Sequence, residues 1–191
     1  MRILLVCDSS LEKDSLEQLL LDQGHTMIAN IRSSDNVLVI AEASRPGAII
    51  VYVKRQTRQL FRQLEELGDL HPCPVVVFTE KSSADFARDS VKAGISAYIV
   101  DGFSPDRLKT IIDIAVVRFE ERKGLKDELT RTREALSDRK TIEKAKGILI
   151  VEKGLTEEEA YQALRQMALR QNMKMAQIAR NIITMAEVLV S

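Results

Sequence analysis

The chain has 191 residues, 45% of them hydrophobic and 29% charged, which is enough to bury a sizeable core and indicates neither wholesale disorder nor a membrane protein. Its 28 basic and 28 acidic side chains give a net charge of zero, so no whole-molecule field attracts nucleic acid, and any such site must be local. No apolar run approaches the roughly 18 residues of a membrane span, and the apolar stretch before Asp8 is too short for a secretory signal, so we expect a cytoplasmic protein.

The two cysteines, Cys7 and Cys73, each lie beside an apolar run and outside any CxxC or Cys/His pattern. The sequence therefore predicts buried thiols rather than a zinc site or a disulfide framework. His25 and His71 have no Ser, Cys or second His at a spacing typical of a triad or a metal site. We expect no metal, no cofactor and no enzyme activity.

Up to residue 117, short β-branched runs alternate with amphipathic stretches, which is typical of a parallel sheet with crossover helices. The expected strands are residues 3–6, 27–31, 48–53, 75–79 and 97–100. The first expected helix opens with a Ser9/Glu12 capping box and ends at Gly24. Its apolar stripe consists of Leu11, Leu16, Leu19 and Leu20. The other expected helices are residues 37–43, 60–67, 86–93 and 108–117. This is the content of one doubly wound five-stranded α/β domain.

From residue 118 the aromatic and β-branched residues thin out, and Leu125, Leu129, Thr132 and Leu136 follow the 4-3-4 spacing of a coiled-coil seam. We predict that residues 118–138 are a coiled-coil linker and that Leu125, Leu129 and Leu136 join two copies in a homodimer. The alternative is one long helix that packs on its own domain.

Residues 139–191 predict a small bundle of three helices. The first ends at Lys153, where Gly154 supplies a left-handed cap. The second opens with a capping box of Thr156 and Glu159 and ends near Asn172.

Polar residues follow the expected strands of the first domain, at Cys7–Asp8, Tyr52, Thr79 and Asp101, and the carboxyl ends of parallel strands meet at one edge of a sheet. The runs ILLVCD, PGAIIVYV, VVVFT, KAGISAYIV and FSPDRL resemble a two-component receiver. This resemblance implies a flavodoxin-like fold for residues 1–117.

A phosphorylated receiver has an aspartate at the position of Tyr52, a pair of acids at Cys7 and Asp8, and a lysine at Asp101. A phenol with an ordinary pKa of about 10 is a poor nucleophile at neutral pH, and one carboxylate holds magnesium weakly. The resemblance therefore implies a pseudo-receiver with a degenerate phosphoacceptor pocket of Cys7, Asp8, Tyr52, Thr79 and Asp101, which signals through protein contact. Asp8 and Asp101 fit equally well as solvated loop carboxylates or helix caps.

No acidic residue occurs between Arg45 and Leu64, where basic side chains gather instead. Tyr52, Lys54 and Arg55 are our first candidates for a partner's docking surface, because this basic segment replaces the phosphate chemistry.

Residues 118–191 hold 15 basic and 12 acidic side chains, a net of +3, so a local cationic surface is available there. The segment EKAKGILIVEKGLTEEEAYQALRQMALRQNMKMAQIARNII resembles the ANTAR domain of transcription antitermination regulators. The matching positions are Ala145–Lys146–Gly147, Ile148–Leu149, Thr156, Glu159–Ala160–Tyr161, Leu164–Arg165, Ala168 and Ile178–Ala179. The resemblance implies that residues 139–191 are an RNA-binding domain.

The candidate RNA contacts are Lys144, Lys146, Gly147, Tyr161, Arg165, Arg170 and Lys174. The cations suit phosphates and base edges, and Tyr161 suits stacking on a splayed loop base, although it fits a core phenol as well. A glycine within a helix costs about 1 kcal/mol, so Gly147 suggests close approach by a neighbouring helix or by a nucleic-acid backbone.

Similarity to the nitrate-responsive, NasT-type members of this family implies a homodimer that binds paired hairpins in a nascent leader mRNA. It also implies control of nitrate or nitrite assimilation through a NasS-like ligand-sensing protein. The alternatives are a DNA-binding response regulator and a dimeric scaffold, although we find no helix-turn-helix signature.

Overall fold

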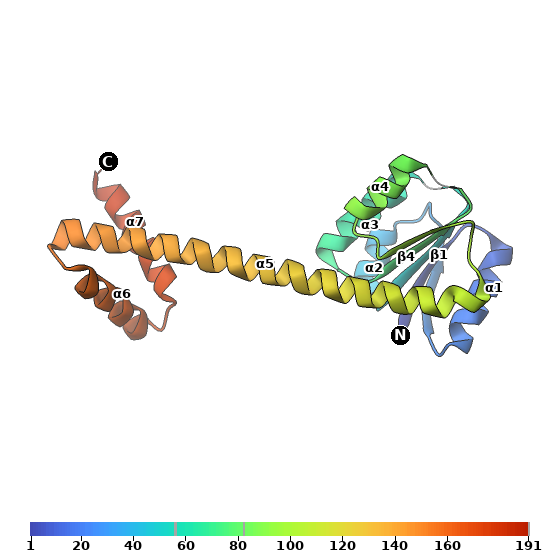
Figure 1. Cartoon of the computed structure of the whole chain (residues 1–191), viewed down its shortest axis with the longest axis horizontal. Coiled ribbons are helices and arrows are strands. Elements are labelled where there is room, and N and C mark those ends of the chain that lie inside the picture. Colours follow the sequence, from blue (N-terminus) through green and yellow to red (C-terminus); the bar gives the residue numbers. More distant parts are fainter. Residues whose placement is uncertain (56, 82, 191) are drawn as a thin grey trace. The chain divides into compact units, whose positions relative to one another are not determined.

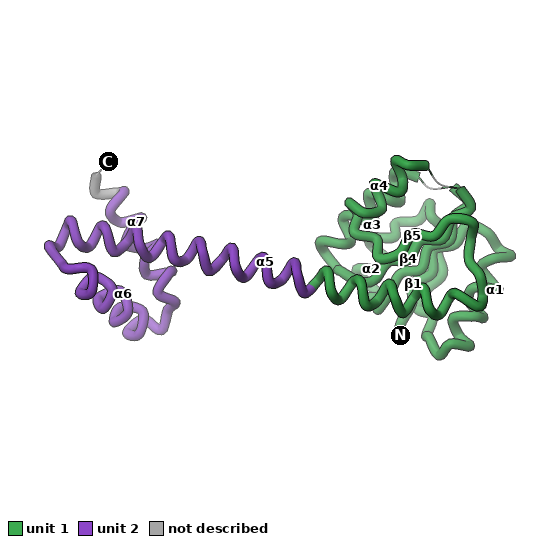
Figure 2. Tube along the Cα trace, viewed as in Figure 1, with its two compact units in different colours: residues 1–123 green, residues 124–191 purple. Residues whose placement is uncertain are grey.

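The computed structural model describes residues 1–55, 57–81 and 83–190, so the last residue of the expected third domain, Ser191, lies outside the described part. The chain forms two compact units, residues 1–123 and 124–191 (Figure 2). The first unit extends six residues beyond the boundary that we expected at residue 117. In the described part, no helix is both long enough and apolar enough to traverse a bilayer.

The first unit contains the expected doubly wound sheet (Figure 1). Its parallel strands are β1 (Arg2–Cys7), β2 (Thr26–Ile31), β3 (Ala48–Val53), β4 (Val75–Thr79) and β5 (Ala97–Val100), in the order β2-β1-β3-β4-β5. The crossover helices are α1 (Ser10–Asp22), α2 (Val37–Ser44), α3 (Arg58–Leu70) and α4 (Ala84–Lys92), and α5 follows β5. This strand order is one of the two common doubly wound arrangements, in which ligands meet the carboxyl ends of the strands.

Each face of the sheet buries its own apolar layer, because successive residues of a strand point to opposite faces. Ile3 and Leu5 of β1 face α1 and α5, whereas Leu4 and Val6 face α2 and α3. β3 is buried along its whole length. The buried layers hold the strand ends in place at the edge where the candidate pocket lies.

The start of α1 differs from our expectation. Ser9 is the N-cap, but its hydroxyl donates a hydrogen bond to the Glu12 carboxylate and caps no backbone N–H. The predicted capping box is therefore wrong. Leu11 is also misplaced in the predicted stripe, since it is 83% exposed while Leu16 and Leu20 are fully buried.

α5 runs unbroken from Pro105 to Lys153 over 49 residues. It joins three segments that the sequence suggested as separate: the last helix of the sheet domain, the linker, and the first helix of the bundle. No proline interrupts this stretch after Pro105, and its two glycines, Gly124 and Gly147, remain helical. A glycine in a helix costs only about 1 kcal/mol, which a long helix tolerates.

The second unit is a small bundle of the end of α5 with α6 (Glu157–Gln171) and α7 (Met175–Val190). The expected ends of the helices are confirmed: Gly154 and Asn172 adopt left-handed conformations, and Thr156 and Glu159 form a complete capping box. Its core is aliphatic and small, with Ala145 and Leu149 of α5, Leu164 of α6, and Ile178 and Ala179 of α7.

Candidate functional site

The edge at the carboxyl ends of β1, β3 and β4 brings together Cys7, Tyr52 and Thr79, as the strand register predicts. The Tyr52 residue is only 4% exposed, and its hydroxyl donates a hydrogen bond of 3.3 Å to Glu80. The Phe103 ring packs edge-on against the Tyr52 ring at a centroid distance of 5.8 Å. Aromatic carbon therefore occupies the position at which a receiver presents its phosphoacceptor.

The electrostatics around Tyr52 keep its phenol neutral. Burial, followed by the neighbouring carboxylates of Glu12 and Glu80, raises its pKa to about 12. Lys54 is placed 3.6 Å from the same Glu80 carboxylate, so this cation is already paired. A protonated phenol that is held between carboxylates offers no nucleophile at neutral pH.

Asp8 uses both of its carboxylate oxygens within the chain. The backbone N–H and the hydroxyl of Ser33 donate to them at 2.8 and 2.7 Å. Asp8 therefore fastens the loop after β2, in agreement with the loop-carboxylate interpretation.

The other pocket residues are also engaged within the chain or exposed. Cys7 donates from its thiol to the Ser9 carbonyl at 3.3 Å, and burial raises its pKa. Thr79 is fully buried and donates to the Lys81 carbonyl at 3.0 Å. Asp101 is exposed in a left-handed conformation, with φ of 70°. Among the described residues, no three His, Cys, Asp or Glu side chains gather closely enough to hold a metal ion.

In the bundle, Lys146 has an intramolecular role. Its side chain is 9% exposed, and its ammonium lies 2.9 Å from Glu143 of the same helix and 2.8 Å from Glu157 at the start of α6. The hydrogen bond to Glu157, and then that to Glu143, raise the lysine pKa. This geometry orients α6 against α5, and it leaves the lysine little freedom to reach a phosphate.

Lys144 lies on the surface but is also paired. Its ammonium is 2.8 Å from Glu187 of α7, and Arg180 of α7 is 3.2 Å from Asp138 of α5. These two ion pairs link the first half and the last turn of α7 to α5.

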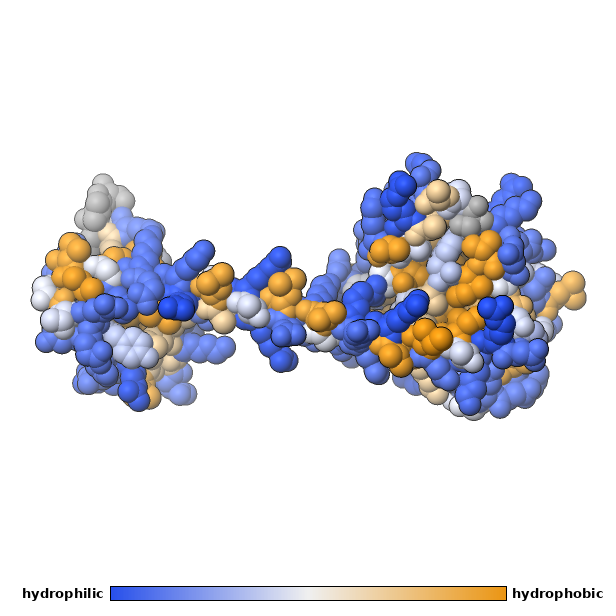
Figure 3. Space-filling model, in the orientation of Figure 1, coloured by the Kyte–Doolittle hydropathy of each residue, from blue (hydrophilic) through white to orange (hydrophobic). Residues whose placement is uncertain are grey.

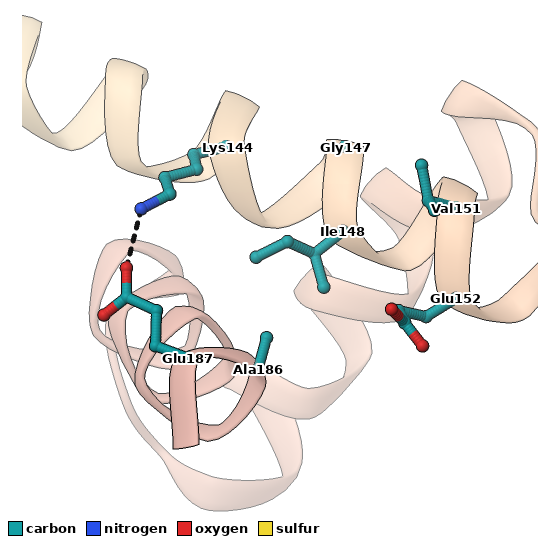
Figure 4. Close-up of a pocket in the computed structure, with 7 residues that line it drawn as sticks. All are labelled: Lys144, Gly147, Ile148, Val151, Glu152, Ala186 and Glu187. Carbon is teal, nitrogen blue, oxygen red and sulfur yellow. Dashed lines mark hydrogen bonds and ion pairs between the residues drawn. The ribbon is translucent and has the colours of Figure 1, made fainter. Parts of the chain in front are cut away.

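Gly147 lines a shallow groove between α5 and α7, in which Ile148 and Ala186 face one another (Figure 4). A Cβ at Gly147 would meet no heavy atom within 4 Å. The helix-packing explanation of this glycine is therefore wrong within the chain, and the space above it is open to another molecule.

The candidate cations of α6 and its following turn are accessible. Arg165, Arg170 and Lys174 are exposed, and none of them forms an ion pair among the described residues. Arg165 and Lys174 line one groove across the α6–α7 turn, together with Ala168, Leu169, Asn172, Met173 and Met175. Tyr161 is 37% exposed and lies outside the apolar core, so its ring is available for stacking.

Leu169 was not among the candidates, although it is 73% exposed and lines the same groove. The sequence could have indicated this residue, because Leu169 is apolar but does not belong to the stripe of α6 that is buried, which consists of Ala160, Leu164 and Ala168. An exposed leucine beside two unpaired cations is suited to contact the apolar face of a ligand.

The predicted dimer leucines are exposed in the single chain. Leu125, Leu129 and Leu136 have exposed fractions of 62%, 51% and 55%. Apolar side chains emerge among hydrophilic ones along the middle of α5 (Figure 3). Ile114 and Val117, also exposed on α5, were not among the predicted contacts.

Each of the two units is similar to known proteins. Residues 130–183 match the ANTAR domain family. The chain is 29% identical to the transcriptional regulatory protein PdtaR of Mycobacterium tuberculosis over 182 residues, which are 95% of this chain and 89% of that protein. It is 40% identical over 76 residues to the nitrate regulatory protein of Klebsiella oxytoca, covering 40% of this chain and 19% of that protein. Among solved structures, a CheY-like receiver domain from Methanospirillum hungatei is similar to this chain with a TM-score of 0.56 and 24% identity. The match covers 63% of this chain and 97% of the receiver domain, which shows the receiver fold.

Proposed function

We propose that the chain, whose residues 130–183 match the ANTAR domain family and whose first unit has a receiver fold, binds RNA as a transcription antitermination regulator, controlled by a protein partner rather than by phosphorylation. The similarity to a nitrate regulatory protein supports nitrate or nitrite assimilation as the regulated process. The longer match to PdtaR, a transcriptional regulatory protein, supports transcription regulation without assigning the signal.

The observation that carries this proposal is the groove at the α6–α7 turn. Arg165 and Lys174 line it without an ion-pair partner among the described residues, and Leu169 lines the same groove. Cations at the rim suit phosphates, and an apolar floor suits the face of an unstacked base. A hairpin loop offers both, whereas the deep, narrow major groove of an RNA duplex does not admit side chains.

Gly147 supports the same proposal from the other side of the bundle. Nothing in the described chain requires a glycine there, and the residue costs helix stability. We infer that an RNA backbone or base approaches α5 at this groove, where a Cβ would stand in its way.

The exposed leucines of α5 support a homodimer. Burying Leu125, Leu129 and Leu136 against a second copy removes three exposed apolar side chains from water. A dimer presents two bundles to one transcript, so binding of the second hairpin becomes intramolecular and gains effective concentration. Paired hairpins in a nascent leader mRNA are the matching ligand.

The altered receiver pocket supports control by protein contact. Tyr52 cannot act as the aspartate does, and Asp8 is committed to Ser33. The proposed partner is a NasS-like ligand-sensing protein that holds the regulator until its ligand arrives. Incubation with acetyl phosphate and magnesium should leave the chain unmodified.

The RNA assignment is tested by gel shifts with a two-hairpin leader RNA over a salt series, with promoter DNA as the competing ligand. We expect Arg165→Ala/Lys174→Ala to weaken RNA binding at least tenfold and to reduce the salt slope by about 2, since each phosphate contact contributes about 1. Lys109→Ala, which removes an exposed cation of the first unit, is the control and should bind as the parent does. Tighter binding to DNA than to RNA would contradict the proposal.

A further inference from the structure

The outer face of α3 carries charges in an order that opposes the helix dipole. Arg58 and Arg62 lie in its first half, and Glu65, Glu66 and Asp69 lie in its second half. The first turn has no acidic residue and the last turn has no basic one. Helices are stabilised by the reverse order, so this arrangement does not serve the stability of α3.

The basic end of this face is free for binding. Arg58 and Arg62 of this face, and Arg55 in the segment that precedes α3, are exposed, and none of them forms an ion pair in the described part of the chain. Our first candidates for a docking surface need correction on this point. Tyr52 is buried and Lys54 is paired with Glu80, whereas Arg55 is exposed and forms no ion pair among the described residues.

Two hollows flank this face. The one toward α4 lies beside Phe61 and Phe86, whose rings are 5.3 Å apart. Its charged lining is Arg58, Arg62, Glu65, Asp89 and Lys92, with the two arginines at the basic end of α3. The one toward α2 is lined by Asn36, Leu38, Gln59, Arg62, Gln63 and Glu66. Arg62 lines both hollows, so a partner that binds over this residue can insert side chains into the hollow on either side.

We propose that the outer face of α3 is a protein-docking surface, on which an acidic patch of a partner pairs with Arg55, Arg58 and Arg62. This inference rests on the proposed control by a protein partner and assigns it a location. Three unpaired guanidinium groups complement clustered carboxylates, with which arginine forms bidentate hydrogen bonds.

The charge order on α3 favours a protein over a nucleic acid. Glu65 and Glu66 follow the arginines on the same exposed helix and would repel a phosphate backbone that continued along it. A folded protein can match the basic end with carboxylates and the acidic end with cations.

The test is site-specific photo-cross-linking in growing cells, with the photoreactive residue at exposed Gln59 and, as the matched control, at exposed Gln18 of α1. We expect a cross-linked protein from Gln59 alone, with the linked peptide in an acidic segment. Arg58→Glu/Arg62→Glu should reduce the yield at least tenfold, and charge reversal of that segment in the partner should restore it. The control reversal Arg107→Glu/Lys109→Glu, on exposed α5 positions, should leave the yield unchanged.

Cross-linking of Gln59 to RNA, to a second copy of the chain or to a segment without net negative charge would overturn the inference, as would no cross-link at all. Binding of the two-hairpin RNA is measured in the same variants. If Arg58→Glu/Arg62→Glu keeps RNA affinity and loses the cross-link, both proposals stand. If the parent protein fails to bind RNA, the proposed RNA function fails whatever Gln59 captures.

Discussion

The ammonium of Lys146 lies 2.8 Å from the carboxylate of Glu157, and this ion pair fixes the end of α5 against the first residue of α6. A residue that looks like a phosphate contact in the sequence thus holds the bundle together. The cations Arg165 and Lys174, by contrast, are exposed and line the groove at the α6–α7 turn.

Lys146→Met should lower the melting temperature of the protein, because it leaves Glu143 and Glu157 without their common cation. RNA affinity should fall only in proportion to the unfolded fraction. Thermal melts followed by circular dichroism, together with gel shifts well below the transition, separate the two effects. A variant with unchanged stability and weakened RNA binding would restore Lys146 as a direct contact.

The same ion pair makes bundle stability depend on pH. Hydrogen bonding to Lys146 lowers the pKa of Glu157 below its ordinary value of 4.5, and the Thr156 backbone N–H lowers that of Glu159. Since both carboxyl pKa values are depressed on folding, their stabilisation is complete above pH 4.5 and is lost as pH falls through the folded values. Lys146 has a raised pKa, so its contribution is complete below pH 10.5 and is lost at higher pH.

Melting temperatures measured from pH 3 to pH 8 test the predicted loss of stability at acidic pH. Glu157→Gln should flatten the fall in melting temperature at acidic pH. The control is Glu158→Gln, which removes a carboxylate that accepts a hydrogen bond of 3.0 Å from the neutral amide of Gln162 and touches no cation of the ion pair. Equal slopes for the two variants would contradict the assignment.

Gly147→Ala should separate binding from folding. A Cβ there meets no atom of the described chain, so the change should raise stability by up to about 1 kcal/mol. RNA affinity should fall about tenfold if the ligand occupies the groove. Gly124→Ala is the matched control, since Gly124 is also helical in α5 and also has open space around it. Unchanged RNA affinity for Gly147→Ala would remove this groove from the interface.

Leu129→Gln should weaken the homodimer. Each leucine buried at an interface contributes about 1.5–3 kcal/mol, and both copies lose one, so the dissociation constant should rise at least tenfold. Sedimentation equilibrium measures this shift, and Leu11→Gln, which changes a leucine exposed on α1, is the control. A parent protein that stays monomeric even with two-hairpin RNA would refute the dimer.

Tyr52 should titrate well above the ordinary tyrosine value of 10, since its pKa is raised to about 12. Folding favours its protonated form, so the stability it contributes is complete below pH 10 and is lost as pH rises toward 12. Absorbance at alkaline pH, with circular dichroism as the check on unfolding, should show a late component that Tyr52→Phe removes. Its persistence in that variant would assign the component elsewhere.

Sequence patterns predicted the sheet well, because each strand is a short β-branched run between turn residues. The bounds of β3, β4 and β5 are confirmed to the residue. Changes of composition at residues 118 and 139 predict three separate helices, and this division is wrong, because no proline or capping motif stands there and α5 is continuous. Composition marks what a helix contacts, while stop signals mark where it ends.

The state of each candidate cation could not be predicted, because it depends on contacts between elements. Glu157 follows Lys146 by eleven residues and reaches it only once α6 folds back, and Glu187 reaches Lys144 from the end of α7. The Glu143–Lys146 spacing on one helix was the available signal for an ion pair.

The ring of Tyr52 at the end of β3 also bears on the duration of the response. An acyl phosphate decays by hydrolysis and so gives an ordinary receiver an internal clock. A phenol pressed against Phe103 has no such bond to break. Under partner control, the active period follows the dissociation rate and the cellular amount of that partner, so the output tracks present ligand occupancy and keeps no chemical record of an earlier stimulus.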